Sequence, residues 1–304
     1  MAQPTLVIGE ALIDIVHRTG RPPVEHVGGS PANVAIGLSR LGHPVELATH
    51  IATDPHGRMI ADLLAAEGVP LTPGSDTATR TPTATALLDD QGVAAYEFDL
   101  EWQMPPVPTE VTHLHTGSIA ATLEPGASAV LAAVEDARPR ATISFDPNLR
   151  PTLMGSAHDV RAKVEQLIGL CDVVKASEED VEWLYDGTPV AEILRLWSRL
   201  GPGLIVITRG GEGAVVTLPG TSEATSVDAK VVDVVDTVGA GDSFMSGLVS
   251  GLLDASLLGG RSARERMRES NLPDIRPAVA RAVAASAVTV SRAGANPPTR
   301  AELL

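Results

Sequence analysis

The sequence is poor in aromatic residues and has a single cysteine. Aromatic side chains make up only 3% of the 304 residues, so the core must be built mainly from Val, Leu, Ile and Ala. Cys171 excludes an internal disulfide, and its neighbours Leu170 and Val173 indicate a buried thiol rather than a nucleophile. No apolar run approaches the roughly 18 residues of a membrane-spanning helix. We therefore expect one large domain with an appendage, or two small ones.

Positive charge is also scarce. The net charge is −15, and only three lysines accompany the arginines. Because a nucleic-acid partner needs a basic surface to contact its phosphates, this balance argues against nucleic acid. The N-terminal residues lack the charged and apolar regions of a targeting signal, so we expect a soluble, cytoplasmic protein without a membrane partner.

The most informative stretch is the glycine-rich segment 236–244, Asp-Thr-Val-Gly-Ala-Gly-Asp-Ser-Phe. The alternating β-branched run 230–235 before it predicts a strand, and the apolar spacing over 243–253 predicts a helix. Small residues at this strand-to-helix turn let backbone N–H groups approach an anion, and the helix N-terminus adds its positive dipole end. The residues that would line this anion site are Gly239, Ala240 and Gly241.

Asp242 follows this turn directly. A carboxylate is a poor ligand for phosphate, but beside an anion site it can take the proton from a hydroxyl that attacks a phosphoryl group. This pairing is typical of a small-molecule kinase. The alternative is a glycine-rich turn in which Asp242 only caps the helix.

A second glycine pair lies near the N-terminus. Gly28 and Gly29 precede Ser30 and Pro31, which suit the N-cap and the first position of a helix, and Asn33 falls in its first turn. Segments 28–35 and 236–244 resemble the first and second signatures of the ribokinase-like (PfkB) family of carbohydrate kinases, in the right order and about 210 residues apart. The likeness extends from Gly9 to Arg300 and is strongest to the fructokinase branch.

The resemblance implies an α/β fold with a doubly wound, mostly parallel sheet, and the repeated strand–helix alternation predicts the same architecture. It also implies one kinase domain over residues 1–304, with a small inserted β lid whose strands lie within about 15–27 and 75–104. Residues 83–98 indicate a hairpin with an acidic-glycine turn at 89–92. Tyr96 and Phe98 are expected to wall the sugar pocket, to form a lid–lid contact in a homodimer, or simply to pack the lid.

The resemblance further implies which residues bind the sugar. A carboxylate accepts two hydroxyl donors and therefore suits a vicinal diol. Asp14 matches the family's sugar-holding aspartate, although a solvated strand-end carboxylate is the alternative. Arg150 ends an Asp-Pro-Asn-Leu-Arg segment similar to that of fructokinases and 2-keto-3-deoxygluconate kinases, and a structural salt bridge is its alternative. The expected substrate-binding residues are Asp14, Gly28, Gly29, Asn33 and Arg150.

ATP, Mg²⁺ and, in some members, K⁺ are the implied cofactors. The family's Asn-x-x-Glu motif is replaced by Ser177 and Asp180, which also form a capping-box pattern. The expected ATP-binding residues are Ser177, Thr208, Gly210, Gly211, Gly213, Gly239 and Gly241. Carbonyl groups near Asp236, Val238, Thr289 and Gly294 would enclose the monovalent cation.

Four further expectations concern structure. His113 and His115 share a strand face without a third metal ligand. The glycines of 209–213 connect two strands, residues 259–275 form a surface loop, and residues 277–291 form a helix.

The expected activity is phosphoryl transfer from ATP to a primary hydroxyl of a small sugar, with fructose favoured. A 2-keto-3-deoxygluconate kinase needs a cationic group for the substrate carboxylate, yet no arginine lies between Thr81 and Trp102, which leaves Arg150. A ribokinase or nucleoside kinase is a weaker alternative, since few aromatics are present to stack a base. A non-catalytic sugar sensor would be expected to have lost Asp242.

Overall fold

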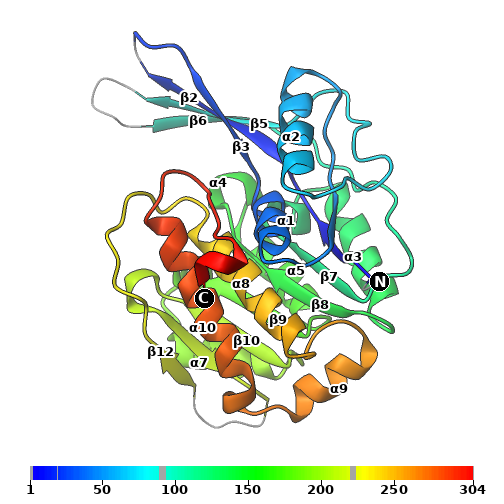
Figure 1. Cartoon of the computed structure of the whole chain (residues 1–304), viewed down its shortest axis with the longest axis vertical. Helices are drawn as coiled ribbons and strands as arrows, with labels where there is room; N and C mark the ends of the chain where they lie inside the picture. The colour runs from blue at the N-terminus through cyan, green and yellow to red at the C-terminus, as the bar shows by residue number, and fades with distance from the viewer. Residues whose placement is uncertain (1–2, 19, 89–93, 220–223, 304) are drawn as a thin grey trace.

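The computed structural model describes residues 3–18, 20–88, 94–219 and 224–303. An eight-stranded sheet with the order β12-β11-β10-β9-β8-β7-β1-β4 forms its centre (Figure 1). Neighbouring strands run parallel except at the pairs β10/β11 and β11/β12, which are antiparallel. The strands are β1 (Thr5–Ile8), β4 (Val45–Ala48), β7 (His113–Gly117), β8 (Thr142–Asp146), β9 (Val173–Ser177), β10 (Leu204–Thr208), β11 (Ala214–Thr217) and β12 (Thr225–Val227).

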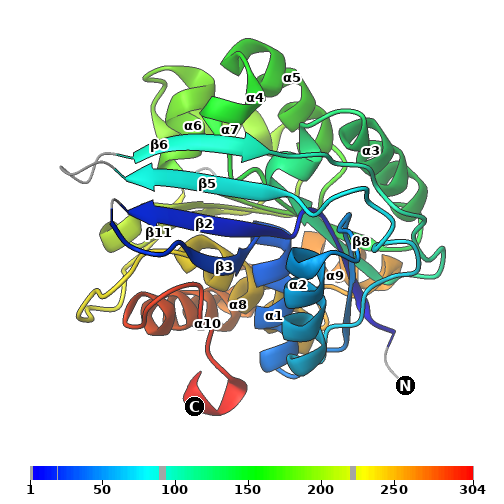
Figure 2. The same ribbon diagram turned by 90° about the horizontal axis from the view of Figure 1, so that it is seen from above.

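Helices cover both faces of this sheet, as the view from above shows (Figure 2). One face carries α1 (Ser30–Arg40), α2 (Pro55–Ala66), α8 (Ala240–Asp254) and α10 (Leu272–Val290). The other carries α3 (Gly126–Ala137), α5 (Ala157–Ile168), α6 (Glu178–Tyr185) and α7 (Val190–Ser198). The short helix α4 (Pro151–Met154) follows β8, and α9 (Arg261–Glu269) lies between α8 and α10. The expected doubly wound, mostly parallel sheet is confirmed.

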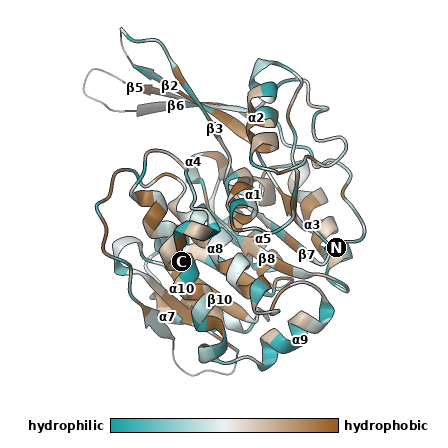
Figure 3. Ribbon diagram, viewed as in Figure 1, coloured by the Kyte–Doolittle hydropathy of each residue, from teal (hydrophilic) through white to brown (hydrophobic). Residues whose placement is uncertain are grey.

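Alternating side chains of the central strands supply two separate cores. Along β1, Val7 packs into the core under α1 and α8, whereas Leu6 and Ile8 pack into the core under α3 and α5. Hydrophobic residues accordingly concentrate on the central strands and the helix faces against them (Figure 3). Within the described ranges, no helix has the length and apolar character needed to cross a membrane.

A second sheet of four strands, in the order β3-β2-β5-β6, projects beyond one end of the central sheet (Figure 1). Its strands are β2 (Leu12–Arg18), β3 (Val24–Gly28), β5 (Thr83–Leu88) and β6 (Ala94–Asp99). Strands β5 and β6 pair antiparallel, as the hairpin prediction requires. The predicted turn at 89–92 and the side chain of Tyr96 lie outside the described residues, whereas Glu97 and Asp99 on β6 are exposed.

Two predicted elements were wrong. Residues 230–235 form no strand, and Val231, Val234 and Val235 are exposed. β-Branched residues favour a strand only where a neighbouring strand offers a partner, and no strand within the described ranges pairs with this run.

The predicted surface loop at 259–275 contains α9 and the beginning of α10. The charged sequence of α9 hid an amphipathic helix, because Arg264 is buried with Ala263 and Met267. Helix α10 begins at Leu272 rather than near Pro277, because Asn271 and Asp274 form a capping box there.

Candidate active site

The glycine turn begins α8, as the sequence predicts, although no strand precedes it. Gly239 is the N-cap and adopts a positive φ of 74°. A Cβ on Gly239 would lie 2.6 Å from the Cβ of Ala295, so a side chain here would meet both strain and a clash. No side chain caps the helix, and the Ala240 N–H donates to the Thr237 carbonyl at 3.2 Å.

Asp242 is the third residue of α8 and does not cap it. Its side chain is buried, and both carboxylate oxygens accept hydrogen bonds from the first turn of α1. The Ser30 hydroxyl donates to Oδ1 at 2.6 Å, and the Asn33 amide donates to Oδ2 at 2.8 Å. These charge-assisted bonds fix the orientation of the carboxylate. The two glycine-rich motifs therefore meet at Asp242, from positions 212 residues apart.

The role of Ser30 differs from the prediction. Gly29 is the N-cap of α1, and Ser30 is the first helical residue. The Ser30 hydroxyl is directed to Asp242 instead of to a backbone N–H group. Sequence reasoning placed Asn33 near the sugar but missed its bond to Asp242. The signal was the i, i+3 spacing of Ser30 and Asn33, which places both side chains on one helix face.

Asp14 lies in the four-stranded sheet beside the glycine pair. Strands β2 and β3 pair Leu12 with Gly28, and a Cβ on Gly28 would lie 2.1 Å from Oδ2 of Asp14. Gly28 therefore leaves room for this carboxylate. Burial raises the pKa of Asp14, and the positive charges of His26 and Arg150 partly offset the rise. Asp14 is thus a half-buried carboxylate rather than a fully solvated one.

Arg150 forms no salt bridge among the described residues. Its guanidinium donates to Oδ1 of Asn148 at 2.8 Å and to the carbonyl of Leu149 at 2.9 Å, within its own loop. Glu10 lies nearby and was not recognised from the sequence. Burial raises the pKa of Glu10 to about 7, and the charge of Arg150 opposes that rise. The charge of Arg150 thus lowers the pKa of both Glu10 and Asp14, although its guanidinium is hydrogen-bonded within its own loop.

Lys175 was also missed, and it is the buried cation of the site. Its Nζ donates to Oδ2 of Asp146 at 2.9 Å, and a Cβ on Gly241 would lie 3.0 Å from Nζ. Burial lowers the pKa of Lys175, but the nearby carboxylates of Asp146 and Asp180 outweigh burial and raise it overall. Lys175 therefore stays charged against the first turn of α8, while Oδ1 of Asp146 is buried without a hydrogen-bond partner.

Ser177 and Asp180 form the predicted capping box at the start of α6. The Ser177 hydroxyl accepts from the Asp180 N–H, and Asp180 Oδ2 accepts from the Ser177 N–H. Asp180 Oδ1 accepts a further bond from the Leu149 N–H at 2.7 Å. Asp180 thus ties the 146–150 loop to α6, and both of its oxygens already accept backbone hydrogen bonds.

The remaining predicted residues lie on two loops. Thr208 ends β10, and residues 210–213 connect β10 to the antiparallel strand β11, as predicted. Asp236 Oδ1 accepts from the Val238 N–H at 3.0 Å, and Oδ2 accepts from the Gly294 N–H at 2.8 Å. The segments expected to enclose a monovalent cation are therefore joined by the Asp236 carboxylate.

The paired histidines and the cysteine belong to the interior. His113 contacts the hydroxyls of Thr142 and Ser144, and His115 contacts Ser144. Burial lowers the pKa of both histidines to about 3, so they are neutral. Burial also raises the pKa of the Cys171 thiol, in agreement with a structural role. No group of three or more His, Cys, Asp or Glu side chains within the described ranges is arranged to hold a metal.

Comparison with known proteins agrees with this geometry. Residues 3–302 match the family described as pfkB family carbohydrate kinase. This chain belongs to the pfkB family of carbohydrate kinases. It is 34% identical to a fructokinase of Klebsiella pneumoniae over 81% of this chain and 83% of that one. It is 32% identical to a fructokinase of Escherichia coli over 100% of this chain and 99% of that one.

A solved fructokinase from Vibrio cholerae O395 has the same fold as this pfkB kinase, with a TM-score of 0.81 and 28% identity. The match covers 99% of this chain and 97% of the other. That structure, a double mutant, contains fructose, ADP and a potassium ion. In this pfkB kinase, Asp242 lies in the first turn of α8, whose N-terminus no side chain caps.

Proposed function

We propose that this protein is an ATP-dependent sugar kinase that transfers the γ-phosphoryl group to a primary hydroxyl of fructose. The observation that carries the proposal is the Asp242 carboxylate, which Ser30 and Asn33 hold beside the N-terminus of α8. The fructokinase relatives and the fructose–ADP complex of the V. cholerae enzyme support both ligands.

Asp242 acts as the general base in this proposal. It takes the proton of the attacking sugar hydroxyl, and the bonds from Ser30 and Asn33 hold it toward that hydroxyl. Backbone N–H groups of Gly239, Ala240 and Gly241 donate to the charge that develops on the transferred phosphoryl group. Lys175 adds a fixed positive charge against the same turn.

The sugar lies between the two sheets. Asp14 accepts hydrogen bonds from sugar hydroxyls, and Gly28 and Gly29 allow the sugar to approach the backbone. Asn33 and Arg150 complete the sugar site, and the four-stranded sheet serves as its lid. Asp14 and Asp242 would thus contact different hydroxyl groups of the same sugar.

ATP lies along Ser177, Thr208 and the glycines 210, 211 and 213, at the carboxyl ends of β9 and β10, where doubly wound sheets bind ligands. Oδ1 of Asp146 would be a ligand of Mg²⁺, because Mg²⁺ prefers oxygen ligands and this atom has no hydrogen-bond partner. Mg²⁺ neutralises charge on the phosphates when bound. The carbonyl-bearing segments around Asp236 and Gly294 fit K⁺.

Fructose is preferred over 2-keto-3-deoxygluconate because the described residues of the lid hairpin β5–β6 include no arginine or lysine that could pair with a carboxylate. Glu97 and Asp99 are exposed on β6, and Arg80 is already paired with Asp99 at 2.6 Å. Arg150 could also pair with a carboxylate, but its guanidinium already donates to Asn148 and to the Leu149 carbonyl. A neutral sugar needs only hydroxyl partners.

ADP release across a panel of fructose, ribose, 2-keto-3-deoxygluconate and nucleosides tests the assignment. We expect the highest kcat/KM for fructose. A clear preference for the keto acid would instead make Arg150 its carboxylate clamp. A preference for a nucleoside or for ribose would make that compound the substrate in place of fructose. If no acceptor were phosphorylated, the protein would instead be a sugar-binding sensor.

We further propose a cytoplasmic homodimer that forms through the four-stranded sheet. Val24 on the edge strand β3 and Leu87 on β5 are exposed apolar side chains that a second copy would cover. Sedimentation velocity of the wild type and of Val24→Asp tests the dimer. A dimer lost in the variant is expected, and a wild-type monomer at all concentrations would contradict the proposal.

A further inference from the structure

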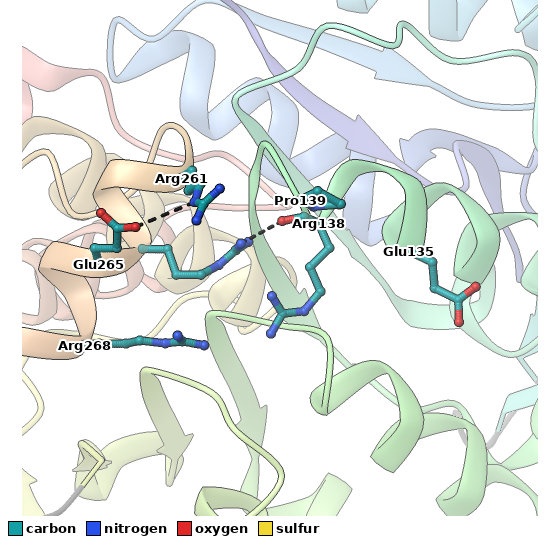
Figure 4. Close-up of a pocket in the computed structure, with 7 residues that line it drawn as sticks. Glu135, Arg138, Pro139, Arg261, Glu265 and Arg268 are labelled. Carbon is teal, nitrogen blue, oxygen red and sulfur yellow. Dashed lines mark hydrogen bonds and ion pairs between the residues drawn. The ribbon is translucent and has the colours of Figure 1, made fainter.

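A cavity of about 490 Å³ lies between the end of α3 and α9, away from the glycine turn (Figure 4). Four of the seven side chains that line it are arginines. The spacing of three of them along α9 places them on one face of that helix. The lining residues are Glu135, Arg138, Pro139, Arg261, Arg264, Glu265 and Arg268.

The cavity lies near the N-terminal ends of strands β8 and β9, whereas the proposed kinase residues lie at the C-terminal ends of these strands. Helix α9 lies against the beginning of β8, where Gly259 N–H donates to the Thr142 hydroxyl at 2.9 Å. Asp172, which pairs with Arg264, directly precedes β9. The kinase residues Asp146 and Ser177 end these same two strands. Because the strands are parallel, the cavity and the proposed ATP site lie at their two different ends.

Arg264 makes the base of the cavity rigid. Its guanidinium donates to both oxygens of Asp172, at 2.5 and 3.0 Å, and to the carbonyls of Arg138 and Ala141. It is therefore fully engaged and nearly inaccessible. The bond to the Arg138 carbonyl, at 2.6 Å, joins the end of α3 to α9 and so connects the two walls of the cavity.

Arg138 and Arg268 stand on these two walls with uncompensated charge. Both side chains extend into the space between α3 and α9 (Figure 4). Among the described residues, neither guanidinium has a hydrogen-bond or ion-pair partner. Two acids also line the cavity, but Glu265 pairs with Arg261 at 3.6 Å, and Arg264 pairs with Asp172. Glu135 is then the one lining carboxylate left for the two guanidinium groups of Arg138 and Arg268, so the lining keeps a positive balance.

Converging cations repel each other unless an anion lies between them. Guanidinium groups bind carboxylates and phosphates through two parallel hydrogen bonds, which gives them a marked preference for such anions. The volume falls within the range of small-molecule pockets, roughly 300 to 1,000 Å³, and exceeds the size of a bare phosphate ion.

We propose that this cavity is a second ligand site, which binds the phosphoryl group of a small phosphorylated metabolite between Arg138 and Arg268. Two sources share this chemistry, a sugar phosphate and a nucleoside monophosphate. The body of the ligand would occupy the part of the cavity that a phosphate alone leaves empty. This second site takes no part in the kinase reaction. The proposal therefore does not depend on which sugar the kinase phosphorylates.

Calorimetric titration of the whole chain tests the proposal, with the kinase site first saturated by ADP and fructose. The probes are inorganic phosphate, glucose 6-phosphate, AMP and, as a carboxylate, citrate. The test variant is Arg138→Gln/Arg268→Gln, whose side chains make no hydrogen bond or ion pair in the described structure. Arg195→Gln/Arg199→Gln is the matched control, because it removes the same amount of charge from two exposed arginines. Arg195 is in α7, and Arg199 follows that helix directly.

We expect at least one phosphorylated probe to bind the wild type and the control equally, and to bind the test variant about tenfold or more weakly, since two charge-assisted contacts are lost. Stronger binding of glucose 6-phosphate or of AMP identifies the source, and the KM for ATP should be unchanged. Equal affinity in all three proteins, citrate binding without phosphate binding, or no binding of any probe would overturn the proposal.

Discussion

The two sheets of this kinase differ in how completely they are buried. Strands β1, β7 and β8 are buried along their whole length, because helices cover both faces of the central sheet. In the four-stranded sheet, Val24, Glu25 and His26 of β3 are exposed, and most of β2 beyond Ile13 is only partly buried. Asp242 is fixed against the first sheet, whereas Asp14 belongs to the second. The proposed general base therefore lies beside the buried sheet, and the proposed sugar contact lies on the exposed one.

The two regions also differ in how far their ion pairs are exposed to solvent. Lys175 and Asp146 are 2.9 Å apart with side-chain exposures of 3% and 1%. Arg80 and Asp99 are closer, at 2.6 Å, but their exposures are 61% and 50%. Water screens the exposed pair, while breaking the buried pair leaves a charge without compensation. Burial, rather than distance, should decide what each pair contributes.

Asp242→Asn should produce the largest effect on activity. Asparagine keeps the size of the side chain but cannot accept the proton, and loss of a general base costs on the order of 10²–10⁴ in rate. We expect kcat to fall by this factor, while calorimetry shows nearly unchanged binding of fructose and ADP. A variant that keeps more than about a tenth of the wild-type kcat would show that Asp242 is not the base.

Lys175→Met should cause the largest loss of stability. It leaves Asp146 buried without its partner, which typically costs about 3–5 kcal/mol in the free energy of unfolding. The double variant Lys175→Met/Asp146→Asn removes both charges and is the matched control. Urea unfolding should show the double variant to be more stable than Lys175→Met alone. Equal loss in both would mean that packing, not the orphaned charge, is responsible.

Asp14→Ala should weaken fructose binding far more than ADP binding. Hydrogen bonds to a charged group contribute about 1.5–3 kcal/mol, so we expect roughly a ten- to hundredfold rise in the Kd for fructose. Calorimetric titration of each ligand checks this, with Asp14→Asn as the isosteric control. An equal loss of affinity for ADP would assign Asp14 a structural role instead.

Arg80→Gln should have the smallest effect. The pair with Asp99 is exposed, and such pairs contribute about 0–1 kcal/mol to stability. Thermal unfolding of Arg80→Gln should therefore be close to that of the wild type. A loss as large as that of Lys175→Met would remove the distinction between the two sheets.

The fold and the position of Asp242 follow from the sequence, because strand–helix alternation and a glycine turn are local patterns. The partners of Asp242 do not, since Ser30 and Asn33 are more than two hundred positions away and their meeting depends on how α1 packs beside α8. Lys175 was hidden for a similar reason. Its partner Asp146 is on the neighbouring strand, and only the β8–β9 register places them together.

The errors have a common physical cause. Residues 230–235 have strand-forming side chains but no pairing strand within the described ranges. The sequence pattern of a segment does not show whether another strand lies beside it. Helix α9 shows the reverse case, in which a tertiary partner makes a charged side chain buried. Arg264 belongs to the interior only because Asp172 and two carbonyls receive it.

In the proposed reaction, Asp242 and the glycine turn promote transfer of the γ-phosphoryl group from ATP to a sugar hydroxyl. Phosphorus NMR of the wild-type protein with ATP, Mg²⁺ and fructose tests this most directly. We expect the γ-phosphate signal to be replaced, mole for mole, by the signals of ADP and of a phosphomonoester on a primary carbon of fructose. An unchanged ATP spectrum, or release of the γ-phosphate as inorganic phosphate, would contradict it.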